Sequence, residues 1–158
     1  MQRVRLSRLS GEPLAAVDYA TCEETYVTLR IYPGEVEPAD VTRAMNLTPT
    51  RQQRRGEPDP SERLPDRTFK LHGWFLSSQG QVASTDSQLH LDWLLQKLSG
   101  REKTLEQLRR SGAETDVACF WVSAGGHGGP TLSPERAGQL ARYGLTLWFD
   151  IYFGEAGG

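Results

Sequence analysis

Aromatic and charged side chains recur at alternate positions in three runs of this chain, a pattern more typical of a binding surface than of a catalytic centre. Aromatic rings bury a large area while keeping a polar group available, and charged neighbours add directional hydrogen bonds. If each run is a β-strand, its alternate residues lie on one side of a sheet. The residues expected to share that side are Arg30, Tyr32, His72, Trp74, Trp148, Asp150 and Tyr152. A helix, the N-terminal segment or a second subunit could equally cover this side and make it ordinary core.

A second candidate binding site is the basic cluster of Arg51, Arg54 and Arg55. Guanidinium groups form paired hydrogen bonds with phosphate or carboxylate, so a phosphate-bearing partner is conceivable. Four acidic residues follow between positions 57 and 66, however, and leave the segment nearly neutral. A solvated loop is the stronger interpretation.

A glycine-rich segment, Gly125–Gly129, precedes a helix start at Ser133. Glycine lets backbone N–H groups approach an anion, and a helix N-terminus favours negative charge. The spacing matches neither a Walker loop nor the dinucleotide fingerprint. We therefore interpret the segment as a turn between a strand and a helix.

No catalytic or metal-binding signature is present in the sequence. His72, His90 and His127 are far apart and have no cysteine at metal-ligand spacing. The sequence predicts no catalytic residue, no metal and no cofactor, and favours a protein that is not an enzyme. An enzyme centred on His127 stays open, because catalytic triads are set by geometry.

Four runs have the alternation of β-strands, and they must position the aromatic and charged residues. They are Tyr26–Tyr32, Phe69–Ser78, Asp116–Ala124 and Leu145–Phe153. The third run is apolar on both sides and is expected to be central.

Helix signals separate these runs. A short helix starts with Pro38 in its first turn, and another runs from Ser133 to Gly144. The strongest helix is capped by Thr85 or Asp86 and carries Leu91, Leu94, Leu95 and Leu98 at helical spacing. A more polar helical turn follows Gly100 and ends at Gly112.

Together these elements predict an α+β two-layer sandwich. We expect a four-stranded, mostly antiparallel sheet with the helices packed on one face, built from two strand-helix-strand units joined by the long Leu91–Leu98 helix. A parallel α/β sheet is the alternative, but its strands would be apolar throughout, whereas three of these carry charged residues. The proline-rich segment 47–67 is expected to be a mobile or functional loop.

The order of several short motifs resembles an uncharacterised bacterial family, the domain of unknown function DUF4279. They are Leu47-Thr48-Pro49-Thr50, Gly73-Trp74-Phe75, the Gly125–Gly129 turn, Leu132-Ser133-Pro134-Glu135 and Asp150-Ile151-Tyr152. The resemblance implies a small cytoplasmic α+β domain and brings no catalytic residue, cofactor or substrate. We expect an N-terminal extension at 1–22, a single domain at 23–154 and a tail at 155–158.

Composition narrows the classes of partner. The chain has 158 residues, enough for one domain, and a formal net charge of -2, which does not favour nucleic acid or an anionic membrane. No apolar stretch reaches the length of a membrane span. The widely separated Cys22 and Cys119 indicate a reducing compartment, and we expect a cytoplasmic protein.

Two functions follow as hypotheses. The first is a non-enzymatic binding or interaction domain that contacts a protein partner or a second copy of itself through the aromatic and charged side of the sheet. Small bacterial immunity proteins are one class that such a domain could belong to. The alternative is nucleic-acid or nucleotide binding, in which the aromatic residues stack on bases and the Arg51, Arg54 and Arg55 cluster meets phosphates. The acidic balance makes nucleic acid the less favoured partner.

Overall fold

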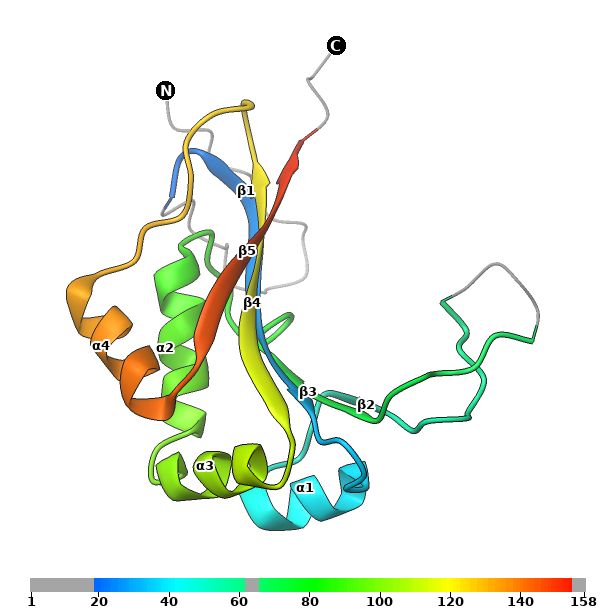
Figure 1. The fold of residues 1–158 in the computed structure, drawn as a ribbon. Helices are drawn as coiled ribbons and strands as arrows, with labels where there is room; N and C mark the ends of the chain where they lie inside the picture. Colours follow the sequence, from blue (N-terminus) through cyan, green and yellow to red (C-terminus); the bar gives the residue numbers. More distant parts are fainter. Residues whose placement is uncertain (1–18, 62–65, 155–158) are drawn as a thin grey trace, which may run out of the picture.

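The computed structural model describes residues 19–61 and 66–154, which form an α+β fold with one open, mixed sheet (Figure 1). The N-terminal extension predicted at 1–22 therefore lies largely outside the described residues, as does the tail at 155–158. The sheet order is β2-β3-β1-β4-β5. The strands are β1 (Cys22–Tyr32), β2 (Arg51–Gln53), β3 (Gly73–Ser77), β4 (Glu114–Ser123) and β5 (Thr146–Phe153).

The predicted α+β class is confirmed, and the described residues form a sheet of five strands where four were expected. β1 lies at the centre and pairs antiparallel with β3 and β4, and β2 pairs antiparallel with β3. β5 pairs parallel with β4, after a crossover through a helix. The two strand-helix-strand units are thus not equivalent, since one pairs its strands antiparallel and the other parallel.

In the described part of the chain, four helices pack on one side of the sheet: α1 (Pro38–Met45), α2 (Ser87–Lys97), α3 (Glu102–Arg110) and α4 (Pro134–Tyr143). The two units are connected by α2, the helix expected to join them, and by α3, which forms where a more polar helical turn was expected after Gly100. Gly100, with a φ of 79°, lies between α2 and α3, a conformation that glycine adopts without steric cost.

Local sequence explains where the helices begin and end. The Asp86 carboxylate accepts a hydrogen bond from the backbone N–H of Gln88 at the start of α2, and the Ser133 hydroxyl accepts one from Arg136 at the start of α4. Gly144, in the left-handed region, ends α4. These are the caps expected from the sequence.

The core lies between the helices and the inner side of the sheet. Leu91, Leu94, Leu95 and Leu98 of the α2 segment are all buried, as their spacing predicts. Facing them are inward side chains of β1 and β4, among them Val27, Leu29, Ile31, Val117 and Trp121. Each such side chain contributes about 1.5–3 kcal/mol by leaving water.

The prediction of which β3 side chain points away from the core is wrong for Trp74. Trp74 is paired with the inward-facing Ile31, is fully buried, and donates its Nε1–H to Thr42 Oγ1 of α1 at 3.0 Å. Phe75 instead lies opposite Arg30, on the side away from the helices. Both sides of this run are apolar, so alternation gave no means of choosing between them.

The segment 47–67 is not simply a loop. Its residues Arg51–Gln53 form the edge strand β2, and the two arms continue toward each other through hydrogen bonds between Gly56 and Phe69 and between Asp59 and Arg67. In Figure 1 this hairpin extends away from the helices. The polar sequence of β2 has no apolar alternation, which is why the strand escaped prediction.

Candidate functional site: the open face of the sheet

The side of the sheet opposite the helices, here called the open face, carries a band of aromatic and charged side chains. No helix in the described part of the chain covers it (Figure 1). The register aligns its members across all five strands. They are Tyr26, Arg30 and Tyr32 of β1, Arg51 of β2, Phe75 of β3, Asp116 and Phe120 of β4, and Trp148, Asp150 and Tyr152 of β5.

Arg30 lies at the middle of the open face and is held in one position. Its Nε and Nη2 donate to the two carboxylate oxygens of Asp116 at 2.7 and 2.6 Å. Its guanidinium carbon lies 4.8 Å from the ring centroid of Trp148 and 5.8 Å from that of Tyr32. The hydrogen bond to Asp116 raises the pKa of Arg30 further above its usual value. A bidentate pair with stacked rings fixes geometry as well as charge.

Ring contacts continue the band on both sides of Arg30. Tyr26 stacks on Phe120, with centroids 4.7 Å apart, and Phe120 contacts Tyr152 at 5.3 Å. Tyr32 meets the edge of Phe75 at 5.7 Å. The side chains of neighbouring strands therefore support one another, and the surface is largely preformed.

Among the aromatic rings of the band, exposure is greatest on β5. Phe75 is 4% exposed. Arg51 covers part of it, with the Arg51 guanidinium carbon 4.2 Å from the centroid of the Phe75 ring. Trp148 is 37% exposed and Tyr152 is 50% exposed. The carboxylate of Asp150 raises the pKa of the Tyr152 hydroxyl, so Tyr152 stays a hydrogen-bond donor at neutral pH. The aromatic rings most accessible to a partner are thus on β5.

The structure brings together most of the residues expected to share this face. Arg30, Tyr32, Trp148, Asp150 and Tyr152 lie on it. Trp74 belongs to the core, as described above. His72 lies before β3, is 7% exposed, and has its Nε2 3.8 Å from a carboxylate oxygen of Glu37.

Sequence reasoning missed four residues of the open face: Tyr26, Phe75, Asp116 and Phe120. Tyr26 and Asp116 were inside predicted strands, and alternation alone places Tyr26 on the side of Arg30. The contact between Asp116 and Arg30 depends on strand pairing, which local patterns do not specify.

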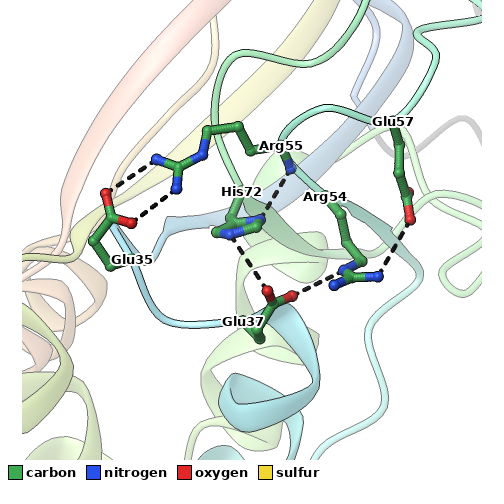
Figure 2. Close-up of polar contacts among 6 residues, drawn as sticks. All are labelled: Glu35, Glu37, Arg54, Arg55, Glu57 and His72. Atoms are coloured by element: carbon green, nitrogen blue, oxygen red, sulfur yellow. Dashed lines mark hydrogen bonds and ion pairs between the residues drawn. The ribbon is translucent and has the colours of Figure 1, made fainter.

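The predicted basic cluster is neutralised by acidic partners (Figure 2). Arg54 Nε donates to Glu37 at 2.8 Å, and Arg55 forms two hydrogen bonds with Glu35 at 3.0 and 2.8 Å. These contacts lower the pKa of both carboxyl groups. Arg51 lies apart, over Phe75 on the open face. The three arginines therefore do not converge on one anion.

His72 joins this cluster through the backbone. Its Nδ1 accepts a hydrogen bond from the backbone N–H of Arg55 at 3.0 Å (Figure 2). The ring thus connects the start of the hairpin to the segment before α1, where Glu37 lies. A buried histidine that accepts a backbone hydrogen bond on one nitrogen and lies near a carboxylate on the other has the contacts of a structural residue.

The glycine-rich segment forms a turn between β4 and α4. Gly128 has a φ of 83°, and a Cβ there would lie 2.5 Å from the hydroxyl of Thr21. His127 is exposed, and the Ser123 hydroxyl donates to the backbone carbonyl of His127 and not to its ring. No serine-histidine pair of the catalytic kind is formed here.

The buried thiol of Cys119 is poorly suited to nucleophilic chemistry. Burial raises the pKa of the Cys119 thiol to about 11, so it carries little thiolate at neutral pH.

Within 19–61 and 66–154, no three His, Cys, Asp or Glu side chains are grouped as metal ligands. The helices of those same residues are all too short or too polar to cross a bilayer.

Comparison with known proteins gives a family and no function. No match to this chain was found among curated proteins or among solved structures. The family model described as "Domain of unknown function (DUF4279)" matches residues 23–154, which include every strand residue of the open face. The chain therefore belongs to the DUF4279 family.

Proposed function

We propose that this protein is a non-enzymatic binding domain that contacts a protein partner through the open face. The observation that carries the proposal is the fixed Arg30, paired with Asp116 and stacked against Tyr32 and Trp148. Binding surfaces are dominated by tryptophan, tyrosine and arginine held in fixed positions. The thiol of Cys119 is free and buried, which supports action in a reducing, cytoplasmic compartment.

Preorganisation supports this assignment. A partner loses affinity when side chains must be ordered on binding, at about 0.5–1.5 kcal/mol for each flexible side chain. On the open face, Arg30 is already ordered by Asp116, and Tyr26 is already stacked on Phe120. The cost of association is correspondingly lower than for a surface of mobile arginines and lysines.

Charge favours a protein partner over nucleic acid. Arg30 is paired with Asp116, and Asp150 is a second carboxylate on the same face. Arg54 and Arg55 are paired with glutamates away from it. Single-stranded nucleic acid needs a groove of uncompensated positive charge as well as stacking rings.

The test compares capture by matched variants. The full-length chain, its Trp148→Ala and Tyr152→Ala variants and a Leu89→Ala control are immobilised at equal density, and partners captured from a native lysate are quantified by mass spectrometry. Leu89 is 43% exposed and lies on α2, on the side of the sheet opposite the open face. We expect at least one protein to be captured by the parent and the control and lost from both open-face variants.

Two results would remove the proposal. One is capture that is equal for all four chains, which would mean that the open face is not used. The other is tight binding of a fluorescent single-stranded oligonucleotide that weakens with salt and is lost in Trp148→Ala. That result would assign the same face to nucleic acid.

A further inference from the structure

The edge strand β5 exposes apolar side chains on both of its sides. On the side of the helices, Phe149, Ile151 and Phe153 are 40%, 46% and 73% exposed, and on the open face Trp148 and Tyr152 are 37% and 50% exposed. Over the ranges that the structure describes, no strand pairs with the outer edge of β5. A long, apolar, unpaired edge is a template for pairing with another chain.

The opposite edge of the sheet is built differently. It is formed by β2, only three residues long, with the sequence Arg51-Gln52-Gln53. A short, polar edge strand is one of the ways in which proteins prevent edge-to-edge association. The protection at β2 and its absence at β5 single out β5 as the associating edge.

The backbone of β5 is oriented for such pairing. Gly154 donates its N–H to the Ser123 carbonyl at 2.9 Å, so its backbone points toward β4. Along a strand, the N–H and C=O of successive residues point alternately to the two edges. The backbone N–H and C=O groups of Tyr152 and Asp150 therefore also point toward β4. Those of Phe149, Ile151 and Phe153 point outward, to the free edge.

We propose that β5 pairs antiparallel with β5 of a second copy of this chain, in a two-fold dimer whose two sheets are continuous. The two-fold axis passes beside Ile151. Phe149 then lies opposite Phe153 of the second copy, and Ile151 lies opposite its own counterpart. These residues all have outward backbone groups, so each pair can exchange two backbone hydrogen bonds.

The sequence of β5 makes a second copy the occupant. Its one charged residue is Asp150, and in this register Asp150 lies opposite Tyr152 of the second copy, a hydroxyl donor. Within one chain the Tyr152 hydroxyl already donates to Asp150 at 3.3 Å. Each pair between residues 149 and 153 is therefore apolar with apolar or donor with acceptor, which is the self-complementarity that a two-fold interface requires.

Other registers are less favourable. Centring the axis on Asp150 places two carboxylates directly opposite each other, which destabilises a strand pair. Centring it on Phe149 moves the interface toward Leu145, which is only 6% exposed, and toward the contact of β5 with α4. The register centred on Ile151 buries the most exposed part of the strand.

This inference goes beyond the proposed function and does not depend on it. Two sheets joined edge to edge by a two-fold axis perpendicular to them present both open faces on the same side. The dimer would therefore double the binding surface and leave each copy of Arg30 accessible. A monomer could still bind a partner, with one surface in place of two.

The test uses the full chain in sedimentation velocity over a concentration series. We expect a dimer that becomes a monomer in Ile151→Pro, because proline removes only the outward N–H and leaves the hydrogen bonds to β4 in place. Ile151→Lys should give the same result through charge. Leu71→Lys, the same kind of change at an exposed site away from β5, should remain dimeric, and circular dichroism should show all three variants folded.

Cysteine substitution tests the register. In Ile151→Cys the two new thiols would lie across an antiparallel pair with Cα atoms about 5.5 Å apart, within the range of a disulfide. Mild oxidation should therefore link the two chains. In Phe153→Cys the thiols are offset by four residues along the strand and should stay unlinked. Cys22 and Cys119 are buried and give little background.

Three results would overturn the inference. They are a wild-type chain that stays monomeric at all concentrations, a dimer that persists in both Ile151→Pro and Ile151→Lys, and a disulfide that forms in Phe153→Cys but not in Ile151→Cys. None of these results bears on partner capture by Trp148→Ala. The dimer and the proposed function can therefore fail separately.

Discussion

Truncating Trp74 and Trp148 separately should destabilise the fold to very different extents. Trp74 is fully buried and donates a hydrogen bond to Thr42, so Trp74→Ala should cost about 3–5 kcal/mol, the range for large-to-small substitutions in a core. Trp148 is 37% exposed and at the sheet edge. Trp148→Ala should cost about 1–2 kcal/mol, including about 0.5–1 kcal/mol for its contact with Arg30.

Urea unfolding followed by circular dichroism measures both values at one protein concentration. A domain of this kind has a total free energy of unfolding of about 5–15 kcal/mol. Trp74→Ala should therefore lower the urea concentration at the unfolding midpoint strongly, and Trp148→Ala should lower it slightly. Trp74→Phe keeps most of the ring volume and should fall between them. Equal losses for Trp74→Ala and Trp148→Ala would refute the reasoning, because Trp148 would then be buried in the folded protein.

Further predictions concern the cluster at the hairpin, a helix end and the buried thiol. Glu35→Gln should lower the urea midpoint slightly at neutral pH and in low salt. Because the partner Arg55 lowers the pKa of Glu35 in the folded state, the difference from the parent should be fully present above the usual glutamate pKa and should be lost as the pH falls through the lowered pKa of the folded state. Gly144→Ala should cost about 1–2 kcal/mol by urea unfolding, since Gly144 has a φ of 67°. With a pKa of about 11, Cys119 should react with iodoacetamide at pH 8 only after unfolding.

Helix ends were predictable because their signals are local. Asp86 and Ser133 each accept a hydrogen bond from a backbone N–H two or three residues later, and Pro134 has the fixed φ of a first helical residue. Such contacts depend only on a few consecutive residues. The helices were therefore found within one or two residues of their observed limits.

Strand pairing was not predictable, because it joins residues far apart in the sequence. β2 has no apolar residue, and its pairing with β3 depends on backbone hydrogen bonds and on the contact of Arg51 with Phe75 across the two strands. The inward side of β3 was misassigned because Trp74 and Phe75 are both large and aromatic. Only the position of β1 beside β3 shows which of them meets Ile31 in the core.

The candidate site was predicted in part for the same reason. Arg30, Trp148 and Tyr152 lie on strands with one clearly aliphatic side, so alternation placed them correctly. The partner of Arg30, Asp116, is on another strand, 86 residues away in sequence. The pairing of Arg54 and Arg55 with glutamates likewise depends on how the hairpin folds back, so composition suggested a basic cluster that the fold neutralises.

Hydroxyl-radical footprinting of the folded protein tests the central claim most directly, because it reports which aromatic rings meet solvent. The open face predicts rapid oxidation of Trp148 and Tyr152 and strong protection of Trp74 and Trp121, both of which are fully buried. Protection of Trp148 and Tyr152 to the level of Trp74 would contradict the account. It would mean that the surface proposed for binding is covered.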